Sequence, residues 1–384
     1  MNETMTYADA FARSFAHEPE FLSFLQTMQD RSRWERQPTR ELEVIALDDH
    51  DPLTRTLRQQ YEHQGLEGVL DDTMEHTRLL LKAQDDLLPV RSCAIRTILD
   101  RARISGSALS QLSKPHLAEV LNRCLHIARG DALLWYSDGK VSAVHGGDVN
   151  DYAVLEIPEL FEHTVRYFAA RYPGYTFAGG SFDHQMVTAI WELTGQDDLV
   201  ETYRQALAHH GLLDEEVSIR PAVRLATSNT GVSGANLYPM LLEGGDAKII
   251  PLGSPIRENH KGNADLARFD ENLDKLFAQY EASLGALTAL LDIELAYPAN
   301  VMQAVLKELG VGKRLSMEAV EQYRAQIGEE PDTAHGVYQA MMEVLFFLQR
   351  DGATGSKIAE MEETLARALK VHWASYDLPG ELKW

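Results

Sequence analysis

Alternating apolar and polar positions are clearest between Ser218 and Leu242, within a chain whose other apolar positions mostly recur at helical spacing. The turn residues Asn229-Thr230-Gly231 separate this run from a second apolar run, Ala235–Leu242. The pattern therefore predicts an antiparallel strand pair. The first strand has two faces: Ile219, Pro221, Val223, Leu225 and Thr227 on one, and Arg220, Ala222, Arg224, Ala226 and Ser228 on the other.

A second hairpin is predicted at Asp131–His145, where Asp138-Gly139 is a strong two-residue turn signal. We expect both hairpins to share one sheet. Between Asp265 and Leu295, leucines and aromatic residues recur in steps of three and four, which predicts one long helix. Such a near-heptad stripe either drives self-association as a coiled coil or packs along a helical domain of the same chain.

These elements predict an α+β protein. We expect residues 1–89 to form an acidic, mainly helical N-terminal arm, and residues 90–260 to form an α+β core domain with a central antiparallel or mixed sheet with helices. Residues 261–384 are expected to form an all-helical C-terminal domain with one long helix.

Charge changes the picture of possible partners. The net charge is −22, and it is spread unevenly: residues 1–89 hold 9 Lys and Arg against 18 Asp and Glu, residues 90–260 hold 15 against 20, and residues 261–384 hold 12 against 20. A field of this sign repels phosphate backbones. Contact with nucleic acid therefore requires a local groove of arginines and aromatic side chains.

The sequence also indicates a compartment. No apolar run approaches the roughly 20 residues that span a bilayer, and the first residues lack the basic and apolar parts of a signal peptide. Cys93 and Cys124 are the only cysteines, too few for a disulfide framework or a zinc cage. We therefore expect a cytoplasmic protein with free thiols and no membrane contact.

Catalytic motifs are lacking. The sequence holds no GxGxxG, GxxxxGK[ST], HExxH or GxSxG, so no cofactor and no metal are expected, and enzymatic activity is the less favoured class. His145 with Asp148, and Asp183 with His184, form a metal or acid–base site if the fold brings them together. Polar residues in loops are the simpler explanation.

The candidate binding residues lie on the first hairpin. Arg220 and Arg224 share a strand face, and antiparallel pairing brings Asn236 and Tyr238 onto or near it. Guanidinium groups beside an aromatic ring and an amide suit single-stranded nucleic acid, where bases stack and phosphates pair. The alternative is that both arginines bridge neighbouring carboxylates. Arg101 and Arg103 are weighed in the same way: they line a basic groove or lie on a solvated helix surface.

Six blocks of the sequence carry a resemblance through their order along the chain. They are ILDRARISGSAL (98–109), LAEVLNRCL (117–125), KVSAVHGGDVNDYAVLEI (140–157), SIRPAVRLATSNTGVSGANLYPML (218–241), VMQAVLKELGVGKR (301–314) and DTAHGVYQAM (332–341). Together they resemble a phage/plasmid-like protein family, a domain of unknown function carried by prophages, phages and plasmids. The resemblance spans roughly residues 90–345. It implies a bacterial cytosolic protein tied to mobile DNA, and it brings no catalytic residues.

Two classes of function follow. The first is a non-enzymatic DNA-transaction module that binds or anneals single-stranded DNA, expected as a homo-oligomer. The second is an acidic factor that binds a host or phage protein, such as an anti-restriction or host-interaction protein whose charge imitates DNA. A metal-dependent hydrolase is a third and weaker alternative.

Overall fold

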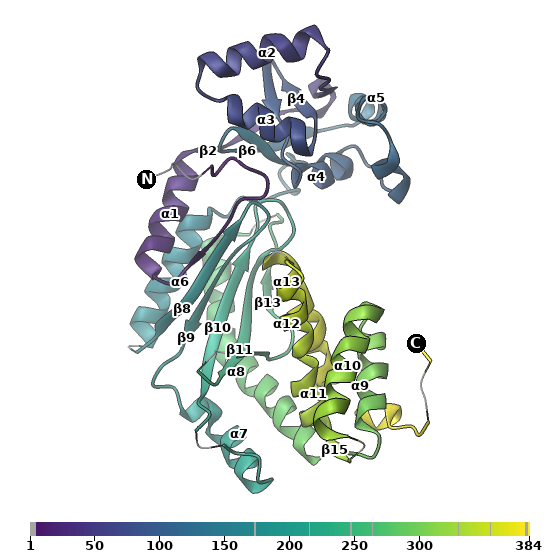
Figure 1. Cartoon of the computed structure of the whole chain (residues 1–384). Coiled ribbons are helices and arrows are strands. Elements are labelled where there is room, and N and C mark those ends of the chain that lie inside the picture. Colours follow the sequence, from purple (N-terminus) through teal and green to yellow (C-terminus); the bar gives the residue numbers. More distant parts are fainter. Residues whose placement is uncertain are drawn as a thin grey trace.

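The computed structural model describes residues 5–172, 174–214, 216–245, 248–262, 264–328, 330–353, 355–380 and 383–384. Within them, seven strands form an antiparallel central sheet (Figure 1). Its strands, in spatial order, are β1 (Ala12–Phe15), β8 (Thr176–Asp183), β9 (Val187–Glu192), β10 (Ile219–Thr227), β11 (Ala235–Glu243) and β12 (Lys248–Pro251), and β13 (Ile256–Glu258) also pairs with β11. The predicted α+β class is confirmed.

The strand pair β10–β11 lies in the middle of this sheet, as the alternation predicted. Arg224 is opposite Tyr238, and Ala226 is opposite Asn236, so these side chains share a face. The opposite face carries Val223 and Leu225, which pack into a core with Phe161 and Leu273. That core is supplied by α1 (Glu18–Asp30), α6 (Ile157–Arg171) and the long helix α8 (Leu266–Ala289).

The apolar stripe of α8 is covered within the chain. Phe269, Leu273 and Leu276 pack under the central sheet, whereas Leu284 and Leu287 join the core of the C-terminal helices. The helix is therefore laid along the protein's own core, which was the alternative to a coiled coil. The surrounding elements are α7 (Asp198–His209), η3 (Leu290–Asp292), β14 (Glu294–Leu295), α9 (Pro298–Glu308), α10 (Lys313–Ile327), β15 (Asp332–Thr333), α11 (Ala334–Met341), α12 (Glu343–Arg350), α13 (Gly355–Ala366), η4 (Arg367–Lys370) and η5 (Trp373–Tyr376).

A separate lobe, at the top of Figure 1, is built on two small sheets. One has the order β2-β6-β7 and the other the order β3-β4-β5. Their strands are β2 (Ser32–Pro38), β3 (Glu43–Ala46), β4 (Leu79–Ala83), β5 (Asp86–Pro89), β6 (Asp131–Ser137) and β7 (Lys140–Gly146). The helices are η1 (Thr39–Glu41), α2 (Pro52–His63), α3 (Glu67–His76), α4 (Ala94–Arg101), η2 (Ser107–Gln111) and α5 (Lys114–Ile127).

This lobe corrects two expectations. The hairpin at Asp138-Gly139 forms, with both turn residues at positive φ, but β6 pairs with β2 and not with the central sheet. The segment 1–89 is not a mainly helical arm: its described residues contain β1–β5 as well as α1–α3. Strand alternation specifies which face of a strand is buried but not which strand it pairs with. The sequence therefore did not show that β6 pairs with β2, or that residues 1–89 supply strands to three sheets.

Buried cationic groups join the lobe to the N-terminal segment. The Lys140 side chain has no exposed surface, and its Nζ donates to Asp9 at 2.8 Å and to Asp72. Arg91 is 1% exposed and donates to the carbonyl oxygens of Tyr7 at 2.8 Å and Ser137 at 3.2 Å. Residues 7–9 are therefore held in place by charge-assisted hydrogen bonds rather than by regular structure.

A second buried pair joins the C-terminal helices to the central sheet. Arg224 on β10 is 5% exposed, and its two terminal nitrogens donate to the two carboxylate oxygens of Glu362 on α13, one of them at 2.9 Å. Burial lowers the pKa of Arg224 to about 10. Beside this pair, Arg257 on β13 contacts Glu363. The acidic helix α13 therefore covers the arginine-bearing face of the sheet. In the part of the chain that is described, no helix combines the length and apolarity needed to cross a membrane.

Replacing Glu362 with Gln should destabilise the protein by about 3 kcal/mol, because it leaves the Arg224 guanidinium buried without its counter-charge. Urea unfolding measures this as a lower midpoint. The matched control is Glu360→Gln on the same helix, where the carboxylate is exposed, and it should leave the midpoint nearly unchanged. Equal midpoints for the two variants would show that the buried pair does not hold α13.

Candidate functional site

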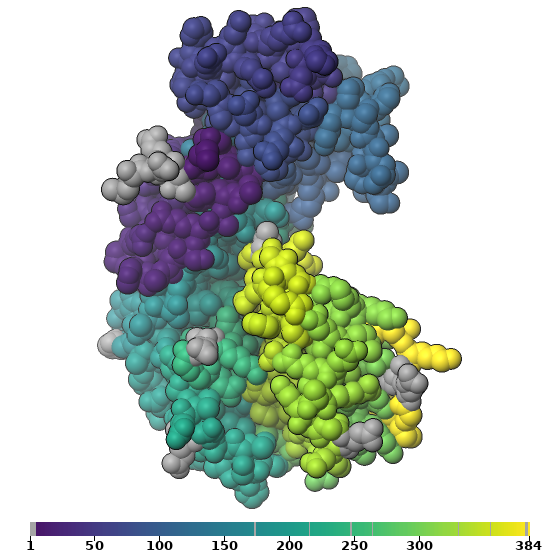
Figure 2. Space-filling model, in the orientation of Figure 1, coloured from purple at the N-terminus to yellow at the C-terminus, as the bar shows by residue number. Residues whose placement is uncertain are grey.

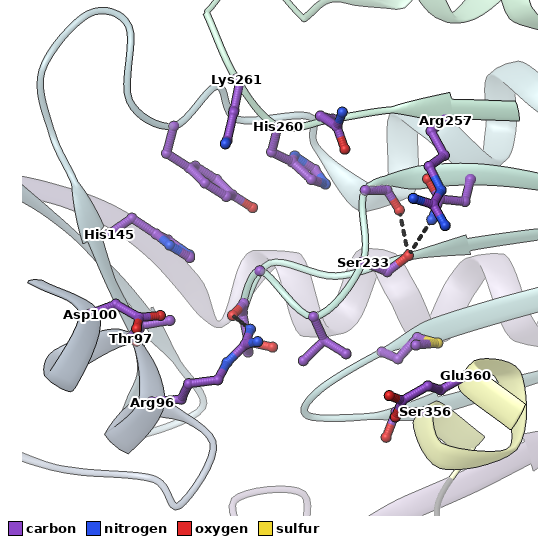
Figure 3. Close-up of a pocket in the computed structure, with 18 of the residues that line it drawn as sticks. Arg96, Thr97, Asp100, His145, Ser233, Arg257, His260, Lys261, Ser356 and Glu360 are labelled. Atoms are coloured by element: carbon purple, nitrogen blue, oxygen red, sulfur yellow. Dashed lines mark hydrogen bonds between the residues drawn. The ribbon is translucent and has the colours of Figure 1, made fainter. Parts of the chain in front are cut away.

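A cavity of about 920 Å³ lies where the lobe, the central sheet and α13 meet. Figure 2 shows a hollow between the lobe and the C-terminal helices, and Figure 3 shows the side chains that line the cavity. Its walls come from α4, β7, the loop 228–234, β13 and α13. Pockets of this size take small molecules or short segments of a polymer.

One wall is a column of stacked rings. The centroids of His145 and Tyr152 are 3.9 Å apart, with planes 6° from parallel. The other face of Tyr152 meets His260 at 5.1 Å and 5°. Trp34 packs against the column, 5.5 Å from Tyr152. Because the rings support one another, they are fixed in orientation before any ligand arrives.

Burial keeps this column uncharged. It lowers the pKa of His145 to about 4 and also lowers the pKa of His260, and it raises the pKa of Tyr152. Each shift has desolvation as its largest cause, since the charged form of a buried group loses hydration. At neutral pH the wall is therefore a neutral aromatic surface.

Charged side chains line the rest of the cavity in equal numbers. The cations are Arg96, Arg101, Arg257 and Lys261, and the carboxylates are Asp100, Asp151, Glu360 and Glu363. The lining is therefore formally neutral in a protein of net charge −22. Lys261 is exposed and forms no side-chain hydrogen bond or ion pair with any described residue. The lining is thus less acidic than the protein as a whole, and Lys261 is the lining cation that has no carboxylate partner among the described residues.

The loop between β10 and β11 enters the cavity. Thr230, Gly231, Val232 and Ser233 all line it. Arg96 on α4 donates to the Thr230 carbonyl at 3.0 Å, which ties the loop to the lobe. Gly231 has a φ of +72°, a conformation in which glycine is favoured. The turn predicted at Asn229-Thr230-Gly231 is thus a wall of the site.

The candidate residues from the sequence divide into two groups. Asn236, Tyr238 and Arg101 line the cavity. Arg101 is 8% exposed and donates to Thr39 Oγ1 at 2.7 Å, so only part of this group is available. Arg103 is exposed just after α4 and does not line the cavity.

Arg220 and Arg224 both form ion pairs with carboxylates of the same chain. Arg220 donates to Glu192 at 2.9 Å and to the Gly244 carbonyl at 2.9 Å, and Arg224 is buried against Glu362. Both arginines bridge carboxylates, which was the alternative to a binding face. The expectation that they contact a ligand together with Tyr238 therefore does not agree with their placement. A buried guanidinium needs its counter-charge, and Glu362 lies 138 residues further along the chain.

Sequence reasoning missed several lining residues. Tyr152, Lys261 and Arg96 come from separate loops and a helix, without periodic spacing. The sequence suggested His145 only for a metal or acid–base site. The Asp-Gly hairpin before His145 was the single local signal near this wall.

The histidines proposed for a metal or acid–base site do not meet. His145 lines the large cavity, and its Nε2 contacts the Asn229 carbonyl at 2.7 Å. His184 lines a different cavity of about 40 Å³, and its Nε2 contacts the Ala8 carbonyl at 3.1 Å. The Asp148 carboxylate accepts from the Asp131 amide, and the Asp183 carboxylate accepts from the amides of residues 185 and 186. Loop hydrogen bonding, the simpler explanation, accounts for these contacts.

Metal-type ligands also gather elsewhere. Among the described residues, Asp9, Asp72 and His76 place their ligand atoms within 4.8 Å of one another. The ammonium group of Lys140 bonds to both carboxylates, so the positive charge that a metal ion would bring is already supplied. This cluster therefore has a structural role, because Lys140 holds the segment that contains Asp9 against the lobe.

Comparisons of the chain with protein-family models, with curated proteins and with solved structures find no match. Function is therefore inferred from the chemistry of the site itself.

The buried histidines predict a loss of stability in mild acid. The pKa values of His145 and His335 are lowered to about 4 and that of His184 to about 3, against an ordinary value of 6.5. At pH values between the lowered pKa and 6.5, each of these histidines binds a proton in the unfolded chain but not in the folded protein. The free energy of unfolding should therefore change little between pH 7 and pH 8 and fall below pH 6.5, by up to about 1.4 kcal/mol per pH unit for each histidine.

Urea unfolding at pH 7, 6 and 5 measures this fall. Asp183 and Glu156, whose pKa values burial raises, act in the opposite direction. His184→Gln should flatten the dependence if the variant folds, whereas His63→Gln, at an exposed position, should not. A midpoint that stays constant or rises from pH 7 to pH 5 contradicts the prediction.

Proposed function

We propose that this protein binds single-stranded DNA in the large cavity and serves in the DNA transactions of a mobile element, without catalysing a reaction. The observation that carries the proposal is the combination, in one cavity of about 920 Å³, of a stacked neutral ring column with cationic side chains, of which Lys261 is exposed and has no carboxylate partner among the described residues. Base stacking and phosphate pairing are the two interactions by which single strands are held.

The position of the rings supports this function. The column His145–Tyr152–His260 is preformed, and it stands beside Lys261 (Figure 3). A single strand has unpaired bases that enter such a cavity and a backbone that remains near its rim. In a duplex the faces of the bases are buried in the stack, so they cannot pack against the ring column and add no affinity there.

The charge of the whole protein limits the affinity. At a net charge of −22, long-range repulsion opposes the approach of DNA, and the cations of the cavity act only at short range. We therefore expect binding in the micromolar range. Salt has two opposing effects, because it screens the repulsion and also competes for the cavity cations.

The resemblance to phage/plasmid-like proteins supports the setting. Three of the resembling blocks, residues 98–109, 140–157 and 218–241, contribute Arg101, His145, Tyr152 and the loop 228–234 to the walls of the cavity. Half of the six resembling blocks therefore contribute to the proposed site. Binding or annealing of single strands is a task that mobile elements require.

The second candidate is an acidic protein-binding factor, favoured by the net charge of −22 alone. Such a factor presents its carboxylates to a basic host or phage protein and needs no cavity. The two candidates are distinguished by substitutions at the cavity lining, which should not change the affinity of a protein-binding factor for its partner.

Fluorescence anisotropy with a labelled single-stranded oligonucleotide tests the proposal at low salt. The double variant Arg96→Gln/Lys261→Gln removes two cavity cations, and its affinity should fall by roughly tenfold, or about 1.4 kcal/mol. The slope of log affinity against log salt should become shallower by about 1.4, because each phosphate contact to a single strand contributes about 0.7.

The matched control removes the same charge elsewhere. Arg55→Gln/Lys275→Gln changes exposed residues on α2 and α8, and should leave affinity within about twofold of wild type. Equal losses in the two double variants would show that only net charge matters. No binding by wild type at micromolar concentration would refute the proposed function.

A further inference from the structure

His145 presents an unused hydrogen-bond acceptor to the large cavity. Its Nε2 lies 2.7 Å from the Asn229 carbonyl oxygen, which is only an acceptor, so Nε2 carries the proton. In the neutral imidazole Nδ1 is then unprotonated, and no described residue donates a hydrogen bond to it. Figure 3 shows the ring pointing into the cavity.

The surroundings fix this ring and leave its edge open. Tyr152 stacks on one face at 3.9 Å, so a ligand reaches the edge more readily than that face. Gly231 lies opposite the edge: a side-chain carbon there would lie 3.3 Å from Cε1 and 3.9 Å from Nδ1 of His145. The glycine therefore keeps the approach to this edge clear.

Asn236 is a second residue of the cavity with an unsatisfied acceptor. It is 6% exposed, and its Nδ2 donates to Ser233 Oγ at 3.0 Å and to Tyr238 Oη at 3.3 Å. These bonds fix the orientation of the amide, and its Oδ1 has no partner among the described residues. A buried acceptor without a donor costs free energy. The Asn236 oxygen has almost no exposed surface, so His145 Nδ1 is the acceptor that favours a ligand with an N–H group.

We propose that His145 Nδ1 accepts a hydrogen bond from an N–H group of a nucleobase, and that this contact selects strands with such donors. The inference rests on the proposed function and adds what the cavity recognises. Phosphates offer only acceptor oxygens at neutral pH, so they belong near Arg96 and Lys261. The base belongs against the ring wall, where Nδ1 meets its hydrogen-bonding edge.

The test compares two oligonucleotides of equal length and charge. One is oligo(dT), in which N3–H is the donor, and the other carries N3-methylthymine, which has no N–H. Wild-type protein should bind oligo(dT) about tenfold more tightly. In His145→Phe, which retains a ring against Tyr152, the two oligonucleotides should bind alike.

Each result decides the inference. Equal binding of both oligonucleotides by wild type overturns the role of His145 and leaves the proposed function standing. Discrimination that persists in His145→Phe assigns the selection to another residue or to the bulk of the methyl group. Binding of neither oligonucleotide overturns both proposals.

A measurement on wild type covers the case in which His145→Phe does not fold. The ¹⁵N chemical shifts of His145 should report an Nε2-protonated ring, and the Nδ1 shift should move on addition of oligo(dT) and not of the N3-methyl analogue. An Nδ1-protonated ring, or an Nδ1 shift that does not respond to oligo(dT), contradicts the inference.

Discussion

The need to neutralise buried cations determines how the parts of this protein are joined. Lys140, Arg91 and Arg224 are all 5% exposed or less. A cation taken out of water is tolerated only where carboxylates or carbonyl oxygens surround it. The carboxylates of Asp9 and Asp72 meet Lys140, and that of Glu362 meets Arg224. Breaking any one of these contacts leaves a buried charge that is neither paired nor hydrated. The lobe, the central sheet and α13 are therefore held in one arrangement.

The large cavity is a consequence of that arrangement. Its walls belong to segments that the buried pairs bring together, and the same pairs remove Arg224 from the surface. The cations that line the cavity are a different set, of which Lys261 has no partner among the described residues. The neutral column built on Tyr152 supplies the complementary apolar surface. Structural and ligand-binding roles are thus divided between arginines that look equivalent in the sequence.

Local patterns predicted the local structure. Turn residues and alternation located the β10–β11 and β6–β7 hairpins and placed Asn236 and Tyr238 on the face of Arg224, and helical spacing located α8. Long-range pairings carry no such signal. Ala12 of β1 pairs with Asp183 of β8, and Asp9, one of the two carboxylate partners of Lys140, lies 131 residues before it. The expected helical arm and the single shared sheet failed for this reason. His260 and Lys261 were missed because they follow a three-residue strand.

Photochemical cross-linking tests the central claim, that the cavity is where a single strand binds, most directly. A single-stranded oligonucleotide carrying 5-iodouracil forms covalent bonds with aromatic side chains that it touches, and peptide mapping locates them. We expect cross-links on the peptides that contain Tyr152 or His260, and their loss when unlabelled single strand, but not duplex, is added in excess. Cross-links confined to peptides outside the lining of the cavity would contradict this account.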